Sequence, residues 1–83
     1  MSLTKQDHLQ LARFILRYQD KHGFPPTCRE IQRGLQLSST CVVHHRLKRL
    51  RELGLLTHRA DTARGIYVNR YAVEHYVRSE AKP

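Results

Sequence analysis

The sequence predicts a mainly helical domain with one small β-hairpin, followed by a C-terminal helix. Three observations predict this fold class. Apolar side chains recur at helical spacing in successive segments of the 83-residue chain. Residues 23–31 combine a glycine, two prolines and a capping pair, which is the pattern of a corner between two helices. Residues 55–59 and 66–69 are predicted as two short strands, and they flank a polar loop that ends in glycine.

The first helix is expected over residues 5–22. Thr4 and Asp7 have the spacing of a capping box, in which each side chain accepts a hydrogen bond from the other residue's backbone. Gly23 can take the left-handed conformation that closes a helix. The apolar face of this helix consists of Leu9, Leu11, Ala12, Phe14, Ile15, Leu16 and Tyr18.

The second helix begins directly after a corner. Pro26 disfavours a helical conformation at Pro25, and neither proline can donate a helix hydrogen bond. Thr27 then offers an N-cap oxygen, with Glu30 at the reciprocal position of a second capping box. We expect this short helix over residues 27–35, followed by a tight connection at Gln36 and Leu37, with Leu37 in the core.

The third helix carries the strongest functional signal. Ser38, Ser39 and Thr40 offer N-cap oxygens, and Gly54 ends the helix. Its apolar stripe is Val43, Leu47 and Leu50, extended by Leu53. The other side shows Cys41, His44, His45, Lys48 and Arg49. Four Lys or Arg residues and no acid occur between positions 41 and 51, whereas a generic surface helix mixes both charges; we therefore expect a binding face.

The composition favours a polyanionic partner. Lys and Arg number 15 and Asp and Glu 7, which gives a formal net charge of +8 and a pI of about 10.2. DNA, RNA or an acidic membrane surface would attract such a charge. The two cysteines make no disulfide framework, and no apolar run approaches the roughly 20 residues of a membrane span. The N-terminus lacks a signal peptide, so we expect a cytoplasmic, nucleoid-associated protein.

Helix, helix, short turn, helix and hairpin is the element order of a winged helix-turn-helix domain, which we assign to residues 1–69. A helix fits the major groove of B-DNA, and residues near its N-terminal half reach base edges. The hairpin, or wing, brings arginines to the sugar-phosphate backbone or the minor groove. The sequence therefore predicts double-stranded DNA as the partner, with no metal, no other cofactor and no small-molecule ligand.

Several blocks of residues stand at matching spacings along the chain. They are Leu3, Thr4, Gly23, Phe24, Pro25, Pro26, Thr27, Glu30, Ile31, Leu47, Lys48, Leu50, Gly54, Arg64, Gly65 and Ile66. On these residues, over roughly positions 4–68, the chain resembles the N-terminal DNA-binding domain of the LexA repressor family. The resemblance implies a bacterial-type transcriptional repressor that binds a palindromic operator as a dimer.

The resemblance and the charge pattern together assign roles to individual residues. Five are expected to face base edges: Ser39, Cys41, Val42, His44 and His45. Seven are expected to hold the DNA backbone: Thr27, Thr40, Lys48, Arg49, Arg51, Arg59 and Arg64. The basic members of this second set would mostly neutralise phosphates.

The chain also departs from the family pattern. The family usually carries an Asn and two acids where this chain has Cys41, His44 and His45, so we do not expect it to read the usual SOS operator. The family tends to place a glycine at the position of Gln36, which predicts a shift at the end of the second helix. The sequence holds no Ala-Gly cleavage site after the wing and no peptidase domain with a Ser–Lys dyad, so self-cleavage is not expected.

The segment 70–83 is expected to form a helix over about residues 70–80, capped by Asn69. Two arrangements of this helix remain open. In one it is a dimerisation element that pairs with a second copy through Tyr71, Ala72, Val73, Tyr76 and Val77. In the other it folds back on Leu11 and Phe14 of the first helix.

Other functions are less well supported by the sequence. The main alternative is a protein-interaction module that docks through its last helix. Cys41 and His45 have a helical metal-ligand spacing, with His44 and Cys28 nearby, but no second ligand pair has finger-like spacing. Neighbouring serines and histidines on an exposed helix provide no catalytic pocket, so we expect no enzyme. Three tyrosines, Tyr67, Tyr71 and Tyr76, favour packing over single-strand stacking, and A-form RNA does not readily admit a helix.

Overall fold

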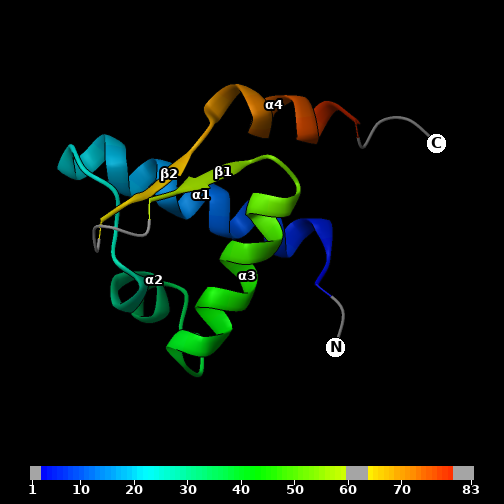
Figure 1. Cartoon of the computed structure of the whole chain (residues 1–83). Coiled ribbons are helices and arrows are strands. Elements are labelled where there is room, and N and C mark those ends of the chain that lie inside the picture. The colour runs from blue at the N-terminus through cyan, green and yellow to red at the C-terminus, as the bar shows by residue number, and fades with distance from the viewer. Residues whose placement is uncertain (1–2, 60–63, 80–83) are drawn as a thin grey trace.

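Four helices and a two-stranded antiparallel sheet form the described part of the chain, residues 3–59 and 64–79 (Figure 1). The computed structural model has the order α1 (Lys5–His22), α2 (Cys28–Gly34), α3 (Thr40–Glu52), β1 (Leu56–His58), β2 (Ile66–Val68) and α4 (Arg70–Ser79). This order confirms the predicted winged helix-turn-helix class with an added C-terminal helix. The division of the chain at residue 69 stays a prediction.

Local hydrogen bonds fix the starts of α1 and α2. The N–H of Asp7 donates to Thr4 Oγ1 at 3.2 Å, and the N–H of Thr4 donates to Asp7 Oδ2 at 2.9 Å. The N–H of Glu30 donates to Thr27 Oγ1 at 3.2 Å, and the N–H of Thr27 donates to Glu30 Oε1 at 2.8 Å. Both predicted capping boxes are therefore confirmed, and each satisfies backbone groups that the helix leaves unpaired.

The starts of α3 and α4 are also capped by side chains. Ser39 is the N-cap of α3, and its Oγ accepts from the N–H of Val42 at 3.3 Å. Asn69 Oδ1 accepts from the N–H of Ala72 at 3.1 Å, which confirms the predicted cap of α4. One expectation for α3 is wrong. Leu53 does not extend the buried stripe but is 36% exposed, because it is the C-cap residue, where the chain leaves the helix.

The turn between α2 and α3 contains a strained residue. Gln36 has φ +54°, a left-handed conformation that L side chains rarely adopt. Its N–H donates to the Arg33 carbonyl oxygen at 3.3 Å, and the N–H of Leu37 donates to the Gln32 carbonyl oxygen at 2.9 Å. This pair of bonds is the Schellman pattern, which usually places a glycine where Gln36 stands. The predicted departure at this position therefore appears as backbone strain.

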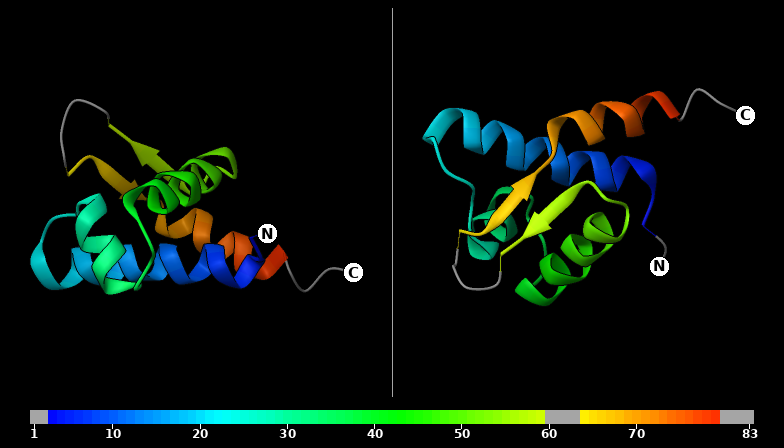
Figure 2. Two further views of the ribbon diagram at one scale, coloured as in Figure 1. Left: turned by 90° about the horizontal axis from the view of Figure 1, so that it is seen from below. Right: turned by 45° about the horizontal axis from the view of Figure 1, so that its top comes forward.

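The core lies between α1, α2, α3 and the sheet (Figure 2). Its largest fully buried side chains come from all of these elements: Leu11, Ile15, Ile31, Val43, Leu47, Leu50 and Ile66. Leu37 packs partly buried against this core, as predicted. Because α3 gives its stripe at positions 43, 47 and 50 to the core, its opposite side faces solvent.

The wing, formed by β1 and β2, is short. Leu56 pairs with Val68 and His58 with Ile66, so each strand is a residue or two shorter than predicted. Beyond the ladder, the N–H of Arg59 donates to the Gly65 carbonyl oxygen at 2.8 Å. A Cβ at Gly65 would collide with the Arg59 carbonyl oxygen, so the two sides of the wing approach this closely only with glycine there. The predicted loop residues 60–63 lie outside the described residues.

An ion pair between Arg64 and Glu30 holds the wing against the corner between α1 and α2. Arg64 Nη1 donates to Glu30 Oε1 at 2.9 Å and to the Pro25 carbonyl oxygen at 2.9 Å, and Nη2 donates to Glu30 Oε2 at 3.1 Å. The same guanidinium lies over the Phe24 ring, 4.5 Å from its centroid. The Glu30 carboxylate therefore caps α2 and binds the wing at the same time.

This geometry changes the acidity of Glu30. The Arg64 guanidinium, followed by the Thr27 N–H, lowers the pKa of the Glu30 carboxyl from 4.5 to about 2. A carboxyl whose folded-state pKa is lowered stabilises the fold fully above its unfolded pKa. That stability is lost as the pH falls through the folded value. The loss window for Glu30 therefore runs from pH 4.5 down to about 2.

Helix α4 packs antiparallel on α1 (Figures 1 and 2). At its start, Arg70 Nη2 donates to Asp20 Oδ1 at 2.9 Å, near the end of α1. One turn and a half later, the Tyr76 ring meets His8 edge-on, with centroids 6.4 Å apart, and Lys5 Nζ lies 4.4 Å from the Tyr76 centroid. These contacts place the start of α4 near the last turn of α1 and its later turns beside the first turns of α1.

The fold therefore has the folded-back arrangement within one chain, and Leu11, one of the two expected partners, belongs to the core cluster against which α4 packs. Val73 is buried, and Ala72, Tyr76 and Val77 pack against the core cluster. Tyr71 is 84% exposed. The ring of Phe14, the other expected partner of α4, lies over Gly34 of α2. The predicted helix extends to Glu80, which lies outside the described residues.

Replacing the strained residue is expected to stabilise the fold. Gln36→Gly should raise the free energy of unfolding by roughly 1 kcal/mol, because glycine adopts positive φ without a steric penalty. Urea unfolding followed by circular dichroism measures this. Gln10→Gly, at an exposed helical position of α1, is the matched control and should destabilise by about 1 kcal/mol. Destabilisation by both variants would contradict the strain at Gln36.

Removing the charge of Glu30 is expected to flatten the acid limb of stability. Glu30→Gln should lower the free energy of unfolding by roughly 1–2 kcal/mol at pH 7, since glutamine keeps an acceptor but loses the charge. The free energy of unfolding of this variant, measured with urea, should then fall less steeply between pH 7 and about 2 than that of the wild type. Glu74→Gln, an exposed position on α4, is the control and should follow the wild-type curve. An unchanged acid limb in Glu30→Gln would rule out this contribution.

Candidate nucleic-acid interface

The exposed side of α3 carries the predicted base-contacting residues. Cys41, His44 and His45 are exposed on the first two turns, whereas Val42 and Ser39 are half-buried. The Ser39 hydroxyl is already used as the helix cap. Figure 2 shows α3 and the wing on the same side of the molecule, away from α1. The fold therefore brings the outer face of α3 and the wing to one surface.

The predicted backbone-contacting residues fall into separate groups. Lys48 and Arg51 are exposed on α3, further along the same side. Arg49 is also exposed and pairs with Glu52, with Nη1 3.2 Å from Oε1. Because both side chains are about half exposed, this pair contributes little to stability and leaves Arg49 able to rearrange. Thr40 begins α3 half-buried.

The remaining predicted backbone contacts lie on the corner and the wing. Thr27 is half-buried and engaged in its capping box. Arg59 is exposed at the end of β1. Arg64 directs its guanidinium to Glu30, while its side chain stays 38% exposed. Its role as a tether for the wing was not predicted, because nothing in the local sequence links positions 30 and 64.

A hollow separates α3 from β1. It is lined by His44, Leu47, Lys48, Arg51 and His58 and has a volume of about 310 Å³. We call it the α3–β1 hollow. No acidic side chain of residues 3–59 and 64–79 lines it. Sequence reasoning assigned no role to His58, because its place beside α3 follows only from how the hairpin packs.

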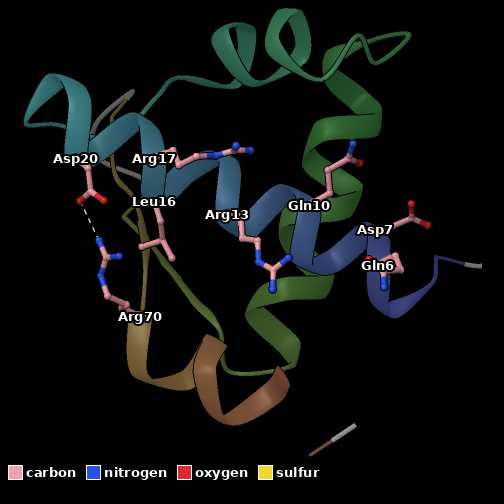
Figure 3. A pocket seen from close by; sticks show the side chains of 8 residues that line it. All are labelled: Gln6, Asp7, Gln10, Arg13, Leu16, Arg17, Asp20 and Arg70. Carbon is pink, nitrogen blue, oxygen red and sulfur yellow. Dashed lines mark hydrogen bonds and ion pairs between the residues drawn. The ribbon is translucent and has the colours of Figure 1, made fainter. Parts of the chain in front are cut away.

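A second hollow, along α1, is a different feature. It has a volume of about 740 Å³ and lies along α1 and the start of α4, lined by Gln6, Asp7, Gln10, Arg13, Leu16, Arg17, Asp20 and Arg70. Its side chains point in different directions, and Asp20 is paired with Arg70 (Figure 3). Both charge signs are present and the polar groups do not converge, so we assign no ligand to it.

The other chemistry considered from the sequence finds little geometric support. Within the described residues, no three His, Cys, Asp or Glu side chains gather where they could hold a metal ion. Burial raises the pKa of the Cys28 thiol, which makes its thiolate less accessible. Of the three tyrosines considered for stacking, Tyr76 is half-buried, whereas Tyr67 and Tyr71 are exposed. No helix in the described ranges has the length and apolar character needed to cross a membrane.

Comparison with known proteins agrees with this geometry. Residues 1–65 match the family described as the LexA DNA binding domain. The chain is 44% identical over 55 residues to a LexA repressor of Roseiflexus sp. (strain RS-1), covering 66% of this chain and 25% of that protein. It is 45% identical over 65 residues to a LexA repressor of Lactobacillus helveticus (strain DPC 4571), covering 78% of this chain and 30% of that protein.

A longer alignment reaches toward the C-terminal helix. The chain is 36% identical over 77 residues to a LexA repressor of Leuconostoc mesenteroides subsp. mesenteroides, covering 89% of this chain and 36% of that protein. The chain thus spans between 25% and 36% of the length of these three relatives. The family match runs from the N-terminus through α1, α2, α3 and β1 to Gly65. The chain belongs to the family of the LexA DNA binding domain.

Proposed function

We propose that this protein is a sequence-specific, double-stranded DNA-binding transcriptional repressor. The observation that carries the proposal is the outer face of α3, where exposed histidines and basic residues stand beside the wing. A helix presented in this way has the dimensions to enter the major groove of B-DNA. The net charge of +8 would supply the electrostatic part of the affinity. The relatives named above are repressors, which supports the regulatory role.

The base-reading residues in this proposal are Ser39, Cys41, Val42, His44 and His45. Cys41, His44 and His45 are the exposed members and would approach base edges first. A histidine N–H can donate to guanine O6 or N7 or to adenine N7, whereas a carboxylate accepts from the cytosine amino group. We therefore propose an operator that differs from the usual SOS sequence at the positions facing His44 and His45.

The backbone contacts in this proposal come from both ends of the interface. Lys48, Arg49, Arg51 and Arg59 would neutralise phosphates, with Thr27 and Thr40 at the helix starts. Arg64 would act mainly by holding the wing through Glu30, and would reach a phosphate only if that bond rearranged. Its removal would therefore combine an electrostatic loss with a displaced wing.

We also propose that two copies bind a two-fold symmetric operator, each reading one half-site. The predicted dimerisation surface was Tyr71, Ala72, Val73, Tyr76 and Val77. Of these residues, only Tyr71 is strongly exposed, because the others pack toward α1 and the core within one chain. A dimer through α4 would therefore have to use the side that carries Tyr71. Without such a contact, the two copies would come together only on the DNA.

Selection from random duplexes, followed by a salt titration of the selected site, tests the function. We expect a palindromic consensus. We also expect the logarithm of the binding constant to fall linearly with the logarithm of the salt concentration, with a steep negative slope that reflects the several phosphates neutralised. Fluorescence anisotropy measures both affinity and slope. No consensus, with weak binding that vanishes at modest salt, would contradict the proposal and turn attention to a protein partner for α4.

Substitution of His45 tests base reading. His45→Ala is expected to cost roughly 1–3 kcal/mol on the selected site and to relax the preference at one base pair per half-site. His75→Ala, an exposed histidine on α4, is the matched control and should bind as the wild type does. If His45→Ala weakens every duplex by the same factor, His45 contacts the backbone and does not read a base.

A further inference from the structure

We propose that the α3–β1 hollow is the binding site for one phosphate of the DNA backbone, with His58 as a contact. This inference rests on the proposed DNA-binding function and adds a specific site to it. The hollow is the place where two elements far apart in the sequence bring donor groups together. His44, Lys48 and Arg51 come from α3, and His58 comes from β1.

The lining has the chemistry of an anion site. Lysine and arginine provide only donors, and a histidine provides at least one N–H. No carboxylate from residues 3–59 and 64–79 competes for them in the hollow. Leu47 is buried and contributes an apolar wall, which strengthens charge-assisted hydrogen bonds at its edge. By liquid volume the hollow has space for about ten waters, which is enough for a phosphate with part of its hydration.

The helix periodicity places this site beside the base-reading face, with His44 at the boundary between the two. His44, Leu47, Lys48 and Arg51 follow the i, i+3, i+4, i+7 pattern and form one edge of α3, the edge next to β1. Cys41 and His45 lie on the neighbouring outward side. When a helix lies in the major groove, its outward side meets bases and its edges approach the flanking backbones. Lys48, Arg51 and His58 are therefore placed for a phosphate and not for a base.

The position of His58 depends on the core and not on the tip of the wing. His58 pairs with Ile66, which is fully buried, and Leu56 on the same strand is buried as well. Leu47, which lines the hollow, is part of the same core. The spacing between His58 and α3 is thus set by packed side chains. A site held in this way is pre-organised before DNA arrives.

Neutralising single phosphates tests the site. In the selected duplex, each phosphate near a half-site is replaced in turn by an uncharged methylphosphonate, and affinities are measured for the wild type and His58→Ala. We expect one phosphate per half-site whose neutralisation weakens the wild type by roughly three- to tenfold but has a much smaller effect on His58→Ala. All other methylphosphonate effects should be the same in both proteins.

Two further variants keep the test decisive. Arg51→Ala should lose its sensitivity at the same phosphate, although Arg51 belongs to a different element. His58→Gln retains an N–H donor and should keep most of the wild-type sensitivity. His75→Ala is again the matched control. If His58→Ala does not fold, the Arg51→Ala and His58→Gln comparisons carry the test.

The outcomes separate this site from the function on which it rests. If the wild type selects no operator, the proposed function fails. If it selects one, but every methylphosphonate effect persists in both His58→Ala and Arg51→Ala, the function stands and the phosphate site is wrong. If inorganic phosphate alone shifts the His58 ring resonances and no methylphosphonate effect changes, the hollow binds a free anion, and its assignment to DNA is overturned.

Discussion

The Glu30 carboxylate is the group on which the arrangement of this domain depends. One oxygen accepts from the backbone of Thr27 and so fixes the start of α2, and both oxygens accept from Arg64 and so fix the wing. The corner between α1 and α2 and the wing are thus joined through a single side chain. Because Phe24 and the Pro25 carbonyl also contact Arg64, the corner sequence forms part of the surface on which the wing rests.

The basic residues of this chain serve two purposes. Arg64 holds the wing to the corner through its ion pair with Glu30, whereas Arg70 makes an exposed pair with Asp20 that contributes little to stability. The basic residues on the outer side of α3 face solvent, apart from the exposed pair of Arg49 with Glu52. A net charge says only that a polyanion is attractive. The proposed DNA surface therefore rests on where the cations lie: Lys48 and Arg51 are exposed on the outer side of α3, whereas Arg64 and Arg70 are paired with carboxylates of α2 and α1.

Helix α4 packs on the winged domain without covering the proposed DNA surface. Its apolar side packs on α1 and the core cluster and not on the outer side of α3, so the addition leaves the proposed DNA surface open. The same packing commits most of the residues that could have formed a dimer contact. In the proposed complex of two copies with DNA, the two-fold arrangement would then come from the operator or from a contact through the remaining exposed side of α4.

The sequence alone determined the parts of the fold that depend on short-range contacts. Capping boxes span three residues, and apolar stripes repeat every turn, so helices α1 to α4 and their caps could be predicted from Thr4, Thr27, Ser39 and Asn69. The family could be inferred from residues at fixed spacing. Only the tertiary structure decided that Arg64 binds Glu30, that His58 stands beside α3, and that Tyr76 packs on His8. These contacts join residues far apart in the chain, and which of several possible partners a side chain meets depends on how whole elements pack.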